Sequence, residues 1–243
     1  MSTILEVSGV SKAFGSLKVI DDFDFELAEG EALGIIGPNG AGKSTLFNLI
    51  TGSLQPNSGS IRFEGVDITQ FPAYRRCRLG IGRSYQIPHP FKGMTVFENL
   101  LVGAAFGKNQ SEVQSYGACA RILDLTGLLE KSNVLAGQLT LLERKRLELA
   151  RALATSPRAL LLDEIAGGLT EPEIQELIQT ISFIRSENIS VIWIEHIVHA
   201  LMSVVDRLIV INFGKKLEDG DPETVIKSPE VQEVYMGIEI EIE

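Results

Sequence analysis

Hydrophobic and polar residues follow two different patterns along the chain. Runs rich in β-branched and aromatic residues, bounded by glycine or polar residues, predict strands at 4–7, 18–27, 32–37, 59–65, 81–86, 158–164, 189–195 and 207–212. Runs with apolar residues three or four positions apart predict helices at 43–52, 72–79, 95–106, 118–129, 139–153, 171–188 and 197–205. The apolar face of the helix at 171–188 consists of Ile174, Leu177, Ile178, Ile181 and Ile184.

The last third of the chain alternates strands and helices. Its strands are almost continuously apolar, which is typical of a parallel sheet covered by helices on both faces. The middle of the chain is mostly helical instead. The pattern therefore predicts an α/β fold in one domain, 1–243, in which a core built from 1–90 and 155–243 carries a helical lobe at 91–154.

The composition is that of a globular protein and narrows the range of partners. A formal net charge of −10 disfavours a nucleic-acid groove or an anionic membrane as primary partner, so we expect no nucleic acid to bind. Cys77 and Cys119 form neither a metal cluster nor a disulfide framework, which fits a reducing compartment. The N-terminus shows no secretory signal, and charged residues interrupt the most apolar stretch, 189–212. We expect a cytoplasmic protein.

The segment "GPNGAGKST", at residues 37–45, follows a predicted strand and opens a predicted helix. It fits the phosphate-binding pattern G-x-x-x-x-G-K-[ST], whose glycines let backbone amides approach phosphate groups. Lys43 would supply a positive charge to the β- and γ-phosphates, and Ser44 a hydroxyl to Mg²⁺. A glycine turn can precede a lysine by chance, but the flanking strand and helix favour the nucleotide site. The predicted ATP-binding residues here are Gly37, Pro38, Asn39, Gly40, Ala41, Gly42, Lys43, Ser44 and Thr45.

A second motif, "LLLDE", ends an apolar strand with two acids, Asp163 and Glu164. Asp163 would hold Mg²⁺, and Glu164 would orient or deprotonate the attacking water. Two acids after a buried strand also serve simply to cap the next helix. The phosphate-binding segment elsewhere in the chain favours the catalytic interpretation.

With these two motifs the chain resembles the ATP-binding subunits of ABC transporters over essentially its whole length. The resemblance implies ATP and Mg²⁺ as cofactors and an ABC-type P-loop NTPase fold: a mainly parallel sheet core, an N-terminal antiparallel β subdomain and an inserted helical lobe. Phe14 matches the aromatic residue that stacks on adenine. Gln86 matches the glutamine that reaches Mg²⁺ and the attacking water, and His196 the histidine that contacts the γ-phosphate. The plainer alternatives are a core phenylalanine, a solvated loop residue and a structural histidine.

Three longer segments, 80–104, 144–164 and 219–237, are similar to the ATPases of branched-chain amino acid import systems. A related class of ATPase drives lipopolysaccharide export. No residue that touches the transported substrate is expected in this subunit, so the cargo follows from the likeness alone.

The segment "LTLLE", 139–143, stands where the family carries its LSGGQ signature. Leu139 and Thr140 match the leucine and serine, but Leu142 replaces the second glycine, which lets amides reach the γ-phosphate of ATP across a dimer interface. We expect the leucine to crowd that approach and to disfavour a left-handed backbone. Losing one hydrogen bond to a charged group costs about 1.5–3 kcal/mol, or roughly 10- to 150-fold. Ile165 and Thr170 are smaller departures, where the family usually has proline and an aspartate or asparagine.

The resemblance implies a motor subunit that binds and hydrolyses ATP for a membrane importer, and that lies on the inner face of the membrane against transmembrane permease subunits. A substrate-binding protein would be an indirect partner. Two ATPase subunits would sandwich the nucleotides, and Leu142 favours a second, different ATPase over a homodimer. Two alternatives remain: a soluble ABC ATPase of DNA repair or translation, and a regulatory subunit with weak turnover.

Overall fold

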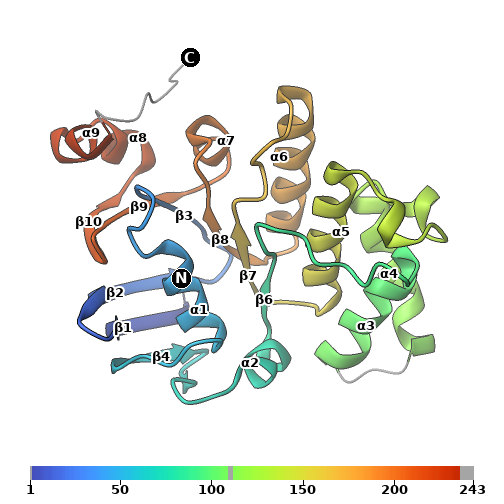
Figure 1. Ribbon diagram of the computed structural model, residues 1–243, viewed down its shortest axis with the longest axis horizontal. Helices are drawn as coiled ribbons and strands as arrows, with labels where there is room; N and C mark the ends of the chain where they lie inside the picture. Colours follow the sequence, from blue (N-terminus) through green and yellow to red (C-terminus); the bar gives the residue numbers. More distant parts are fainter. Residues whose placement is uncertain (1, 109–111, 236–243) are drawn as a thin grey trace.

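The computed structural model describes residues 2–108 and 112–235 (Figure 1). The last two residues of the segment 219–237 therefore lie outside the described part. A six-stranded sheet forms the centre, with strand order β10-β9-β3-β8-β7-β6. Its strands run parallel except β10, which pairs antiparallel with β9. Their bounds are β3 Ala32–Ile36, β6 Ile81–Arg83, β7 Ala159–Asp163, β8 Ser190–Ile194, β9 Arg207–Asn212 and β10 Lys215–Gly220.

Strand β3 shows why this sheet is buried on both faces. All five of its residues are buried. Leu33 and Ile35 belong to one hydrophobic core, and Ala32 and Ile36 to the other, because successive side chains of a strand point to opposite faces. The continuous apolar runs of the sequence therefore reflect helices and a second sheet on the two sides of the central one.

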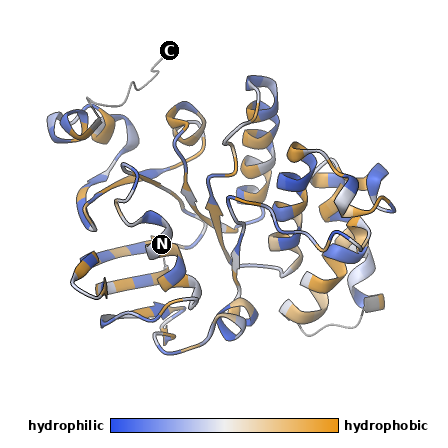
Figure 2. Cartoon of the chain, viewed as in Figure 1, coloured by the Kyte–Doolittle hydropathy of each residue, from blue (hydrophilic) through white to orange (hydrophobic). Residues whose placement is uncertain are grey.

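The first core lies between the central sheet, helix α1 (Lys43–Thr51) and a four-stranded antiparallel sheet of order β2-β1-β4-β5. The strands of that sheet are β1 Thr3–Phe14, β2 Leu17–Ala28, β4 Ser58–Phe63 and β5 Val66–Asp67. Figure 2 shows hydrophilic and hydrophobic positions alternating along β1 and β2, as expected for strands with one face on a core and one toward solvent. The predicted antiparallel β subdomain is confirmed.

The second core is covered mainly by helices from the later part of the chain, together with α5 (Leu141–Ala154). These later helices are α6 Glu171–Ser186, α7 Val198–Met202, α8 Pro222–Ile226 and α9 Pro229–Tyr235. Within the described residues, no helix is long and apolar enough to cross a membrane.

Helices α3 (Val96–Lys108) and α4 (Glu112–Leu125) pack with α5 beside the central sheet (Figure 1). They share a hydrophobic core of their own, which includes Leu100, Leu123 and Leu147. The predicted helical lobe is confirmed, while its exact limits at 91 and 154 stay a prediction. Helix α2 (Ala73–Leu79) connects β5 to β6 and lies outside this lobe.

Candidate functional site

The site predicted from the sequence lies where parallel strands of the central sheet end. Strand β3 runs into the segment 37–45, β7 ends at Asp163, and β8 ends at Ile194, two residues before His196. Asp163 and Ile194 are direct partners in the ladder between β7 and β8. Ligands of open α/β sheets bind at this carboxyl edge, so the fold brings three separate motifs to one place.

The phosphate-binding segment depends on glycine for two different reasons. Gly40 has φ 81° and Gly42 has φ 109°, a left-handed backbone that other residues rarely adopt. A Cβ on Gly42 would also lie 2.8 Å from the carbonyl oxygen of Val19. The loop therefore turns tightly into the N-terminus of α1, and the amides of a helix N-terminus favour bound anions.

Lys43 is buried in this loop and bridges it. Its Nζ donates to the carbonyl oxygen of Gly37 at 2.6 Å and to that of Pro38 at 3.1 Å. Burial lowers the pKa of Lys43, and the negative charges of Glu164 and Asp163 act in the opposite direction. The ammonium group thus lies in the field of both acids, while Ser44, the next residue, is exposed.

Glu164 is held between the two other predicted catalytic residues. Its carboxylate accepts a hydrogen bond from Gln86 Nε2 and lies 2.8 Å from His196 Nε2 through its Oε1 atom. The backbone at Glu164 has φ 47°, and its amide donates to the carbonyl oxygen of Ile194. An acid that merely caps the next helix would not make these contacts, and helix α6 begins later and is capped by Thr170.

Asp163 is almost fully buried and is paired with a residue that the sequence analysis did not select. Its Oδ2 accepts a hydrogen bond of 2.7 Å from Arg83 Nη2. The same guanidinium donates to Asn48 Oδ1, in helix α1. Arg83 lies three positions before Gln86, and its charge at the end of a strand was the available signal.

Two further residues tie the predicted motifs together. Glu195 is buried, and its carboxylate accepts hydrogen bonds from the amides of Ala166 and His196. Burial raises the pKa of Glu195, and these amide donors oppose the effect. Lys145, in α5, donates to the carbonyl oxygens of Ile165 and Gly167. The loop after Glu164 is thereby joined to His196 on one side and to the helical lobe on the other.

Phe14 ends strand β1 and is 49% exposed, so the alternative that it is a core residue is wrong. The ammonium group of Lys12 lies 5.4 Å from its ring centroid. An exposed ring suits stacking on a base.

We expect Phe14→Ala to weaken ATP binding by about 1–3 kcal/mol, the usual contribution of base–aromatic stacking. Because the ring is half exposed, thermal unfolding without nucleotide should change little. Phe106→Ala is the matched control, since Phe106 is an exposed phenylalanine in the helical lobe. Calorimetric titration with ATP measures the effect, and a loss of stability with unchanged affinity would contradict the assignment.

The segment "LTLLE" opens helix α5 with a capping box. Thr140 Oγ1 accepts from the amide of Glu143, and the Glu143 carboxylate accepts from the amide of Thr140. A hydrogen bond from Lys131 is the main cause that lowers the pKa of Glu143. The hydroxyl and the carboxylate together cap the N-terminus of this helix. In Figure 1, the strands β6 and β7 separate α5 from α1.

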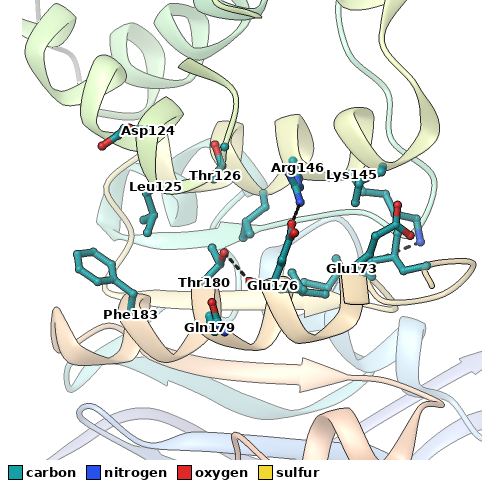
Figure 3. A pocket seen from close by; sticks show the side chains of 16 residues that line it. Asp124, Leu125, Thr126, Lys145, Arg146, Glu173, Glu176, Gln179, Thr180 and Phe183 are labelled. Atoms are coloured by element: carbon teal, nitrogen blue, oxygen red, sulfur yellow. Dashed lines mark hydrogen bonds and ion pairs between the residues drawn. The ribbon is translucent and has the colours of Figure 1, made fainter. Parts of the chain in front are cut away.

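The backbone conflict expected at Leu142 is not present, while the expected crowding across a dimer interface stays a prediction. Leu142 lies in the first turn of α5 with a right-handed backbone, so no left-handed conformation is required of it. Its side chain lines a cleft of about 310 Å³ between α5 and α6, together with Ile165 and Leu177. Figure 3 shows this cleft, with the ion pair between Arg146 and Glu176 across it. The leucine is accommodated because the cleft offers apolar neighbours.

The two smaller departures are also accommodated. Ile165 is buried in the second core. Thr170 is the N-cap of α6, and its hydroxyl and amide both donate to the Glu173 carboxylate. This pairing lowers the pKa of Glu173, with the backbone hydrogen bond from Thr170 as its largest cause.

Comparison with known proteins decides the family. Residues 20–167, more than half of the chain, match the model of the family described as ABC transporter. The chain belongs to the ABC transporter family. It is 39% identical to the high-affinity branched-chain amino acid transport ATP-binding protein BraF of Pseudomonas aeruginosa, over 96% of this chain and 98% of that protein. It is 36% identical to LivG of Escherichia coli K12, whose name describes the same role, with the same coverage.

Solved structures of ABC transporter cassettes share the fold. The ADP conformation of one ATP-binding cassette superposes with a TM-score of 0.89 at 30% sequence identity, covering 98% of this chain and 100% of that one. A nucleotide-free cassette gives 0.88, also at 30% identity, covering 96% of this chain and 99% of the other. The predicted ABC-type fold and the ATPase class are thus confirmed.

Proposed function

We propose that this chain is the ATP-hydrolysing subunit of a membrane importer for branched-chain or similar amino acids. The observation that carries the chemistry is the placement of Glu164 between Gln86 and His196, beside the loop that holds Lys43. The likeness to BraF and LivG, over nearly the full length of both partners, supports the cargo.

The predicted residues have distinct roles in the proposed mechanism. The amides of the segment 37–45 and the ammonium of Lys43 hold the β- and γ-phosphates of ATP. The Glu164 carboxylate accepts a proton from the attacking water, whose oxygen bonds to the γ-phosphorus while the bond to the β–γ bridging oxygen breaks and ADP leaves. Gln86 and His196 fix the orientation of the Glu164 carboxylate. His196 then lies beside the γ-phosphate and stabilises its developing charge.

The residues present suit Mg²⁺ bound together with the nucleotide. Among the described residues, no group of three or more His, Cys, Asp or Glu could hold a metal by itself. Mg²⁺ is usually bound by one or two protein carboxylates and completes its shell with phosphate oxygens, water and other oxygen donors. The Ser44 hydroxyl, the Asp163 carboxylate and the Gln86 amide oxygen are the proposed contacts on this chain, and the ion would neutralise phosphate charge.

We place the permease subunits on a groove of about 310 Å³ beside the Gln86 loop. The groove lies between the core and the helical lobe and is lined by Tyr74, Tyr85 and Arg151, among others. Large apolar side chains in the segment that follows Tyr85, Ile87 and Phe91, are exposed, and the Phe91 ring lies against Arg151 of the groove. Exposed aromatic and apolar residues around a groove are typical of an interaction site. Docking there would hold the chain at the inner face of the membrane.

Reconstitution tests the proposed function. The chain, its membrane partners and their substrate-binding protein are placed in liposomes, and ATP turnover is measured with and without leucine. We expect leucine to stimulate turnover, because import couples cargo delivery to ATP hydrolysis. Stimulation by lipopolysaccharide instead would assign the chain to the export class. Failure to copurify with any membrane protein would favour a soluble ABC ATPase.

A second candidate, a subunit that depends on a different ATPase, is supported by Leu142. Each site of an ABC dimer joins the phosphate loop of one chain to the signature of the other, so a homodimer would contain two sites lacking the glycine. This chain keeps Lys43, Glu164 and His196, which would complete one site with an intact partner signature. We therefore propose a heterodimer, in which turnover is low for this chain alone and is restored by the partner.

The variant Leu142→Gly separates the effect of Leu142 on ATP turnover from its effect on thermal stability. We expect turnover of the chain alone to rise, with little change in the mixture, while thermal stability falls. A glycine in a helix costs roughly 0.5–1 kcal/mol relative to alanine, and the apolar contacts in the cleft are lost as well. Leu141→Gly is the matched control, because Leu141 is 55% exposed in the same turn. Full turnover by the unmodified chain alone would show that the leucine is tolerated.

A further inference from the structure

Arg83 ends strand β6, and its side chain turns into the protein. Only 7% of that side chain is exposed, and only 6% of the Asp163 side chain that it reaches. The guanidinium carbon lies 4.7 Å from the ring centroid of Tyr85 and 5.5 Å from that of Phe47. A planar guanidinium packed over aromatic rings is held in one orientation, so its donors have fixed directions.

Those donors join two parts of the nucleotide site. Nη1 donates to Asn48 Oδ1 at 2.6 Å, and Asn48 belongs to α1, the helix that follows the phosphate loop. Nη2 donates to Asp163 Oδ2 at 2.7 Å, at the end of β7. No described residue donates a hydrogen bond to Asp163 Oδ1. The guanidinium therefore holds one carboxylate oxygen and leaves the other available.

We propose that Arg83 is a positioning residue that orients Asp163 toward Mg²⁺ through this single-oxygen contact. The inference rests on the proposed role of Asp163 at the metal. Carboxylates near a metal are usually held by a hydrogen bond from a neighbouring residue, and removing that neighbour typically lowers metal affinity 10- to 100-fold. Asn48 extends the arrangement by fixing the other end of the guanidinium.

The positive charge of Arg83 has an opposing effect, because it repels a nearby cation. Geometry decides which effect is larger. Without the hydrogen bond from Arg83 the Asp163 carboxylate is free to rotate away from the ion, and a ligand that is no longer held in place binds a metal less well. Loss of Arg83 should therefore weaken the response to Mg²⁺ even though it removes a repulsive charge.

The test measures ATP affinity by calorimetry, first in EDTA and then at increasing Mg²⁺ concentrations. For Arg83→Met we expect an unchanged ATP affinity in EDTA. The Mg²⁺ concentration that produces half of the maximal increase in ATP affinity should be 10- to 100-fold higher than in the wild type. Arg83→Lys, which keeps the charge, should lie between Met and the wild type. If Arg83→Met does not fold, Asn48→Ala loosens the same contact and should shift the Mg²⁺ response in the same direction by less.

Arg76→Met is the matched control. Arg76 is also a buried arginine, but its guanidinium donates to backbone carbonyls, including those of Leu49 and Thr69. Its loss should lower stability and leave the Mg²⁺ response unchanged.

An unchanged Mg²⁺ response in Arg83→Met would overturn the proposal and would show that Arg83 only links α1 to β7. A stronger response would overturn it too, by showing that repulsion dominates. If the ATP affinity of the wild type did not depend on Mg²⁺ concentration, the metal role of Asp163 would be overturned, and the proposed metal site with it.

Discussion

Replacing Glu164 with glutamine should leave ATP bound and lower its turnover about 10²- to 10⁴-fold, the usual contribution of a positioned general base. An amide cannot accept the proton of the attacking water. Glutamine has the same shape as glutamate, and its oxygen can still accept a hydrogen bond from Gln86 or His196. The site should therefore keep its geometry while it loses its base.

The measurement uses single-turnover hydrolysis in the assembled transporter together with equilibrium ATP binding. Glu176→Gln is the matched control, since Glu176 is an exposed acid whose partner is Arg146, away from the phosphate loop. Turnover of Glu164→Gln at the wild-type rate would remove Glu164 from the mechanism. Loss of binding as well would mean that the carboxylate supports the loop rather than the reaction.

Lys43→Ala should abolish tight binding of Mg-ATP. Each hydrogen bond between the ammonium and a phosphate contributes roughly 1.5–3 kcal/mol, so the dissociation constant should rise at least 10- to 150-fold. Lys43 now donates to the carbonyl oxygens of Gly37 and Pro38, and these contacts would be exchanged for phosphate oxygens.

The fold should tolerate this substitution. The pKa of Lys43 is lowered in the folded protein, mainly by burial, so the charged form is less favourable there than in the unfolded chain. The charge thus costs stability at neutral pH, and that cost declines as the pH rises through the lowered pKa. Melting curves should show no marked loss, with Lys227→Ala as the control at an exposed lysine. Unchanged ATP affinity by calorimetry would refute the role of Lys43.

The sequence alone determined the elements whose signal is local. The strand, glycine loop and helix around 37–45 were predicted correctly, because the glycine positions and the apolar run each act within a few residues. The strand ending in Asp163 was found for the same reason. Motif order and spacing then brought Phe14, Gln86 and His196 into the assignment, although none of them is informative by itself.

The tertiary structure decided the features that depend on partners far away in the chain. Strand β1 extends through Phe14, well beyond the apolar run at 4–7, because backbone pairing with β2 and β4 holds its polar residues in the sheet. Strand β10 and helices α8 and α9 were not predicted, since short polar segments carry little periodicity. The strand predicted at 81–86 ends at Arg83 instead, which frees Gln86 to reach Glu164.

The roles of side chains show the same division between what local sequence determines and what distant partners determine. From the sequence, Leu142 could only be compared with the glycine that it replaces, and the cleft that receives it is formed by α6, a helix that begins at Glu171. Likewise, the bond from Arg83 to Asp163 spans 80 positions of the chain and exists only because β6 and β7 are neighbours in the sheet. Local patterns specify backbone conformation within a segment, whereas the partner of a buried charge is set by which segments the fold places side by side.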